Sequence, residues 1–272
     1  MEKKFIGAGL LSGLVAGIVA YIFARIFIEP QVAKAIDYED GRGAAEEALS
    51  GEHGHEHEVF TRSVQENIGA ATGTLVFALC MGAFFAVAFT VLWSYVGRRY
   101  PATDPRAVAA ALGAIGLVVA FGVPFFVYPA NPPAVGDDNT IGDRSGAYLT
   151  ITLVSVIAAI AAVTLALWLR PRLGGLVSAI AAVIPYLAVV TIAAALLPEF
   201  HEVPEALKND AGDIVFPGFP GGVIGDFRVY VIANQVILWT VLATVFALII
   251  WKLEKPRTSV TAAAAERVGA AD

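Results

Sequence analysis

The sequence predicts an all-α integral membrane protein, a bundle of about six transmembrane helices in the lipid bilayer. Hydrophobic residues make up 57% of the chain and charged residues only 15%, whereas soluble domains contain about a quarter charged residues. A transmembrane helix needs about 20 consecutive apolar residues, and six stretches of the chain satisfy that requirement. The basic residues gather on alternate connections between these stretches, as they do in multi-pass proteins of the cell membrane.

The predicted spans are joined by connections of very different length. They cover Phe5–Ile28, Gly69–Val96, Val108–Tyr128, Ala147–Leu169, Leu176–Leu197 and Val229–Trp251. The turn at residues 170–175 is so short that the fourth and fifth spans should be antiparallel neighbours. With their outer loops, 29–68 and 198–228, the spans form one membrane domain, residues 1–257, and we expect residues 258–272 to be a disordered cytoplasmic tail.

The basic residues predict that both termini are cytoplasmic. If the N-terminus is inside, 11 of the 18 lysines and arginines lie on short inner segments, where the positive-inside rule counts most. The outer loops then hold 19 of the 24 acidic residues and all four histidines. An even number of spans returns the C-terminus to the cytoplasm.

The first span carries a stripe of small residues. Gly9, Gly13 and Gly17 follow one another at four-residue steps, which places them on one face of a helix. Small side chains at this spacing let a second helix approach closely. We therefore expect this face to pack against another span and not against lipid.

The stretch from Gly51 to Glu58 is the strongest indication of metal chemistry. It contains His53, His55 and His57, with Glu56 between the last two. Imidazole and carboxylate groups bind zinc, copper, nickel and similar ions. In an extended segment the three rings point to one side, and the glycines favour a flexible loop. Incidental low-complexity sequence is the structural alternative.

A second set of candidate metal ligands lies at the ends of the spans. Glu29 closes the first span, His201 and Glu202 follow the fifth, and Asn234 lies one to two turns into the sixth. We expect the selective site to use these residues, because ligands held on rigid elements bind without an ordering cost. For Asn234 the alternative is a hydrogen bond to a neighbouring helix.

Motifs for catalysis and nucleic-acid binding are absent from the sequence. It contains no GxxxxGK[ST], HExxH or GxSxG pattern, so we predict that the protein is not an enzyme. The isoelectric point is about 5.3 and no basic stripe is present, which argues against a nucleic-acid partner. A single cysteine excludes an intrachain disulfide.

Several short motifs occur in the order typical of one membrane family. They are Glu29-Pro30, His55-Glu56-His57, Pro132-Pro133, Pro185 and Phe227…Asn234…Trp239. The chain thereby resembles the CbtA family of predicted cobalt transporter subunits. The resemblance implies a cobalt permease subunit tied to cobalamin synthesis. It also implies a partner, the small histidine-bearing membrane protein CbtB.

Two functions remain open at this point. The first is a transport subunit that moves Co²⁺ inward, with Ni²⁺ or Zn²⁺ as alternative ions and with a homo-oligomer left open. The second is a non-transporting protein that binds or senses metal and uses the bundle as an anchor. Polar groups buried between spans would favour transport, and a bundle sealed by apolar packing would favour the anchor.

Overall fold

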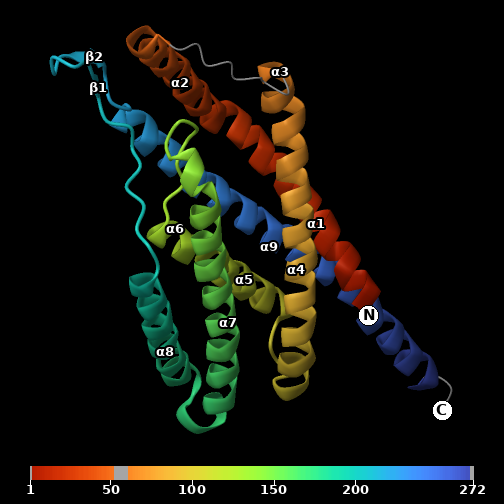
Figure 1. The fold of residues 1–272 in the computed structure, drawn as a ribbon. Coiled ribbons are helices and arrows are strands. Elements are labelled where there is room, and N and C mark those ends of the chain that lie inside the picture. The colour runs from red at the N-terminus through yellow and green to blue at the C-terminus, as the bar shows by residue number, and fades with distance from the viewer. Residues whose placement is uncertain (1, 52–60, 270–272) are drawn as a thin grey trace. The chain divides into compact units, whose positions relative to one another are not determined.

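The computed structural model describes residues 2–51 and 61–269 of the chain. Within them, six helices are long and apolar enough to cross a membrane (Figure 1). These helices are Lys3–Ser50, Arg62–Arg99, Pro105–Val127, Ile141–Leu173, Gly175–Leu196 and Gly221–Leu253. The prediction of an all-α membrane protein with six spans is confirmed.

The first helix is much longer than the sequence predicts. Helix α1 (Glu2–Phe23) passes through a π-helical turn at Ala24–Ile28 into α2 (Glu29–Ser50). Gly51 ends α2 in the left-handed conformation, with φ 69°, which glycine adopts without strain. The first half of the expected outer loop is therefore helical. Its alanine and glutamate residues are strong helix formers, and they outweigh two internal glycines.

The other long helices coincide with the remaining predicted spans, and α7 (Ile141–Leu173) and α9 (Gly221–Gly269) extend beyond them at both ends. The elements after α2 are α3 (Arg62–Val64), a π-helical turn (Gln65–Gly69), α4 (Ala70–Arg99), α5 (Pro105–Gly116), a second such turn (Leu117–Gly122), α6 (Val123–Val127), a 3₁₀ turn (Asp138–Thr140), α7, α8 (Gly175–Leu196), the hairpin strands β1 (Leu207–Lys208) and β2 (Ile214–Phe216), and α9. Helix α9 continues through residues 258–269, where the sequence predicts a disordered tail.

The chain divides into two compact units, and the boundaries after Phe23, Gly116 and Ala233 fall inside continuous helical stretches. The first unit comprises Met1–Phe23, Phe60–Gly116 and Asn234–Asp272. The second comprises Ala24–Val59 and Leu117–Ala233. Each unit is described separately below.

In the first unit, the glycine stripe of α1 packs directly on α4, as the sequence predicts (Figure 1). A Cβ atom added to Gly9 would collide with the carbonyl oxygen of Gly82, and one added to Gly82 would collide with the carbonyl oxygen of Gly9. Gly13 lies equally close to the carbonyl oxygen of Ala78. The two backbones are therefore in contact, which larger residues would prevent.

In the second unit, α7 and α8 lie side by side and antiparallel (Figure 1). Their buried residues recur at every fourth position, so each helix presents one stripe. The stripe of α7 is Ala147, Ile151, Ser155 and Ala159, and that of α8 is Ser178, Ala182, Tyr186 and Val190. The expectation drawn from the short connection at residues 170–175 is confirmed.

Candidate functional site

The histidine run falls outside the residues that the structure describes. His53, His55, His57 and Glu56 all belong to the gap between residues 51 and 61. Within the described ranges, no group of three or more His, Cys, Asp and Glu side chains is arranged to hold a metal ion. The candidate site is therefore built from the other candidate ligands, which lie among the described residues.

Helix α2 is fastened to a segment that follows it by more than 160 residues in the chain. The hydroxyl of Tyr38 donates to the carbonyl of Pro217 at 3.1 Å, and Nη1 of Arg42 donates to the carbonyl of Glu205 at 2.7 Å. The Tyr38 ring also packs on the rings of Phe216 and Phe219, with centroids 5.3 and 4.8 Å away. These contacts hold α2 as a helix beyond the apolar span.

We call this assembly the cap, defined as residues 29–51, 128–140 and 198–228. A small apolar core lies within it, formed by Ala35, Tyr38, Val135, Phe219 and Ile224. Because the cap joins the end of the first span, the end of the third, the end of α8 and the start of α9, it lies on one side of the membrane. It contains the candidate ligands Glu29, His201 and Glu202.

Glu202 joins two segments of the cap. Its Oε2 atom accepts a hydrogen bond from the backbone N–H of Asp137 at 2.9 Å and lies 3.3 Å from Nε of Arg144. Nη2 of Arg144 in turn donates to the carbonyl of Asp137 at 2.9 Å. The Glu202 carboxylate is thus already engaged with protein groups in this structure.

These donors hold the pKa of Glu202 below its usual value. The Asp137 N–H contributes most, followed by the Thr140 hydroxyl and then by Arg144. The Thr140 hydroxyl also donates to the Asp137 carbonyl, at 2.9 Å. With one proton, it serves one of the two acceptors at a time. All these contacts favour the ionised carboxylate.

The remaining candidates in the cap are placed differently. Glu29 begins α2 directly after the π-helical turn and is half-buried. His201 is exposed, next to Glu202. Three residues before His201, the carbonyl of Pro198 accepts a hydrogen bond from the hydroxyl of Tyr128 at 2.7 Å. Burial and the nearby Glu199 carboxylate raise the pKa of Tyr128. The hydrogen bond from Tyr128 to Pro198 therefore holds the segment from which His201 extends.

Asn234 lies within the apolar stretch of α9, in the first unit. Its Oδ1 atom is buried and has no hydrogen-bond partner among the described residues. An unpaired amide oxygen within a bilayer is costly, because lipid offers no donor. The structural alternative is a hydrogen bond that a neighbouring helix donates to this oxygen, and the described part of the chain contains no such bond.

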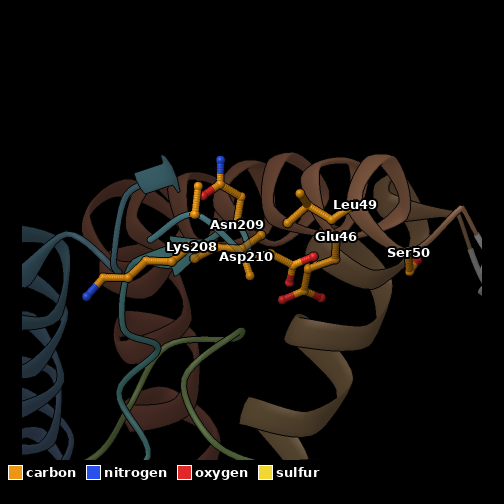
Figure 2. A pocket seen from close by; sticks show the side chains of 8 residues that line it. Glu46, Leu49, Ser50, Lys208, Asn209 and Asp210 are labelled. Carbon is orange, nitrogen blue, oxygen red and sulfur yellow. The ribbon is translucent and has the colours of Figure 1, made fainter. Parts of the chain in front are cut away.

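A hollow of about 660 Å³ lies where the chain leaves α2 for the histidine run. Figure 2 shows it between the end of α2 and the turn of the hairpin, with the carboxylates of Glu46 and Asp210 on the same side. Glu46 also forms an ion pair with Arg42, at 2.8 Å. Ser50, which lines the hollow, is three residues from His53.

Sequence reasoning missed the residues that build the cap. Tyr38 and Arg42 donate long-range hydrogen bonds within the cap, and Arg144 on α7 forms an ion pair with Glu202 of the cap. No local pattern distinguishes these residues from surface residues. A weak signal was present for Arg144, a basic residue among acidic ones on the predicted outer side. Its partner Glu202 is 58 residues away in the sequence, so the pair required the fold.

Six helices that are long and apolar enough to cross a bilayer define a multi-pass membrane protein. The chain belongs to the CbtA family, described as a probable cobalt transporter subunit, and the family model matches residues 2–251. No curated protein and no solved structure matches it. Family membership makes it a transporter subunit with Co²⁺ as the suggested ion, and favours neither an enzyme nor a simple anchor.

Proposed function

We propose that this chain is the membrane-embedded subunit that moves Co²⁺ into the cell, and that the cap is its extracytoplasmic entrance. The family match supports cobalt transport over the whole six-span region. The basic-residue asymmetry of the sequence supports cytoplasmic termini and an outward cap. A subunit has partners, and the resemblance suggests that CbtB is one of them.

Asn234 is the observation that carries a transport role in preference to an anchor. A bundle that only anchored a metal-binding loop would gain stability from an apolar residue at this position. Instead, a buried amide oxygen is left without a partner among the described residues. An amide oxygen is a suitable ligand for divalent cations, so an ion in transit would supply the contact that Asn234 Oδ1 lacks.

The histidine run acts in this proposal as a capture device. His53, His55 and His57, with Glu56, would raise the local metal concentration beside the cap. The hollow at the end of α2 lies at the base of this run and holds the carboxylates of Glu46 and Asp210. Such negative charge attracts a divalent cation. Imidazole has an unperturbed pKa of about 6.5 and must be neutral to bind a metal ion through its ring nitrogen. Capture of the ion should therefore weaken below that pH.

The selective site belongs to the rigid residues. His201 offers an exposed imidazole on a fastened segment, and Glu29 offers a carboxylate at the start of α2. We propose these two as outer ligands, and we propose Asn234 separately as a ligand within the sixth span. Glu202, whose charge already interacts with Arg144, would assist mainly by holding His201 in place.

The concentration dependence of uptake separates capture from selection. Replacing the three loop histidines by alanine is expected to reduce cobalt uptake at low external metal and spare it at saturation. His201→Ala or Asn234→Leu should lower uptake at every concentration, by about tenfold or more, since losing even an outer-shell metal partner costs about 10–100-fold in metal affinity or activity. Gln235→Leu, at the adjacent amide, is the matched control.

The opposite pattern would overturn this division of roles. If the triple histidine variant abolishes uptake at saturating metal while His201→Ala and Asn234→Leu behave like the control, the histidine run is itself the transport site.

The orientation can be tested by labelling. In a Cys80→Ser background, Ser50→Cys should react with a membrane-impermeant maleimide added outside, and Ser259→Cys should react only after permeabilisation. Reaction of both from outside would contradict an outward cap.

A further inference from the structure

The third span contains a backbone carbonyl that its own helix cannot satisfy. In the π-helical turn at Leu117–Gly122, the carbonyl of residue i accepts from the N–H of residue i+5. For Val119 that residue is Pro124, which has no N–H. Within a bilayer, such a carbonyl needs a donor from elsewhere in the protein.

Ser155 on α7 supplies this donor. Its hydroxyl donates to the carbonyl of Val119 at 2.8 Å, and its oxygen lies 2.9 Å from the hydroxyl of Tyr186 on α8. Serine has one proton, and Val119 receives it, so Tyr186 must donate to Ser155. The direction of both bonds is thereby fixed. We call these two bonds the hydroxyl chain.

The hydroxyl chain is enclosed by apolar side chains. Ser155 is 0% exposed and Tyr186 9% exposed. The surrounding cluster consists of Val119, Ile151, Ala159, Tyr186 and Val190. The hydroxyl chain links the third span, α7 and α8 through a buried, apolar region.

Two other buried serines in the described chain bond quite differently. Ser12 donates to the carbonyl of Ala8 and Ser178 to that of Gly174, each at 2.6 Å and four residues back in its own helix. This bonding is the usual way for serine to satisfy its hydroxyl in a membrane helix. Ser155 instead donates to another span, at the carbonyl of Val119.

A regular α register is the alternative to the observed π register in the third span. In the π register, Val119 faces Pro124 and Ser155 satisfies it. In a regular α register, Val119 would accept from Val123, and the carbonyl of Ala120 would face Pro124 instead. The bond from Ser155 to the Val119 carbonyl is made in the π register and therefore favours it.

We propose that the hydroxyl chain is a latch that holds the third span in the π register, and that transport includes its release. Passage to the α register would rotate the segment beyond Pro124 by about 100° and move it by about 1.5 Å. That segment, residues 123–127, leads into the cap at Tyr128. Release of the bond between Ser155 and Val119 would thus transmit a movement of the third span to the cap. This inference rests on the proposed transport function.

Spin labels can report the register of the purified full-length chain in lipid bilayers, without any transport measurement. Phe126 is 89% exposed and Leu153 is 51% exposed, so both accept a label as cysteine in a Cys80→Ser background. The distance between them should change when Ser155→Ala removes the latch. Ser178→Ala, which removes a buried hydroxyl bonded within its own helix, should leave the distance unchanged. Tyr186→Phe should give an intermediate shift.

Cobalt uptake by the same variants, without labels, completes the test. Ser155→Ala should change the maximal rate several-fold with an unchanged KM, because the outer ligands are untouched. An unshifted distance in both Ser155→Ala and Tyr186→Phe would overturn the latch. A shifted distance with wild-type uptake would also overturn it, since release would then play no part in transport. If the wild-type chain itself takes up no cobalt while the distance shifts, the proposed function fails and the register change stands.

Discussion

Glu202 shows how one carboxylate connects segments that are far apart in the sequence. It accepts the Asp137 N–H, 65 residues away, and pairs with Arg144. Sequence reasoning chose Glu202 as a metal ligand because it is acidic and adjacent to His201. The structure gives its charge a second task, which depends on loop contacts that no local pattern encodes.

Neutralising Glu202 should weaken the cap. Its folded-state pKa is lowered, so its contribution to stability is fully present above the unfolded value of about 4.3 and is lost as the pH falls through the lowered value. Glu202→Gln should therefore reduce thermal stability at neutral pH and flatten its decline below about pH 4. The melting temperature of each detergent-solubilised protein, measured across the range from about pH 3 to about pH 8, tests this expectation.

Glu205→Gln is the matched control, because Glu205 lies in the same segment and contributes its backbone carbonyl to the cap. Equal stability curves for the two variants would show that the Glu202 carboxylate adds nothing to the cap.

The helices of this protein differ in how far the local sequence determines them. The spans and the small-residue face of α1 follow from local composition and spacing, and the structure confirms both. Helix α2 and the π-helical turns do not follow from it. Helix α2 is secured by Tyr38 and Arg42 through contacts with residues 205–219, and the turn before Pro124 is satisfied by Ser155. Both depend on partners distant in the sequence.

Enlarging Gly9 should separate α1 from α4. A side chain there would collide with the backbone of Gly82, and overpacking of this kind costs about 1–3 kcal/mol. Gly9→Leu should therefore lower the melting temperature in detergent by several degrees, at about 2–4 °C per kcal/mol.

Gly7→Leu provides the comparison on the same helix, since nothing lies within 4 Å of a Cβ at Gly7. Similar melting temperatures for Gly9→Leu and Gly7→Leu would contradict the backbone contact between α1 and α4.

At the scale of the whole molecule, the chain combines six membrane-spanning helices with a cap built from the ends of four of them. The family match extends over residues 2–251, so both parts belong to the transporter subunit. The sequence alone predicted the class of protein and the number of spans. It did not predict the cap, because the contacts that build the cap join residues that are 65 to 179 positions apart.

Cobalt accumulation in cells that lack their own cobalt uptake tests the central claim most directly. The cells would express this chain, with its partner subunit, and be compared with cells that express the partner and the Asn234→Leu variant at the same membrane level. We expect the wild-type chain to produce saturable accumulation of cobalt inside the cells and the variant to lose most of it. Equal accumulation with the wild-type chain, the variant and the partner alone would contradict a role for this chain in moving the ion.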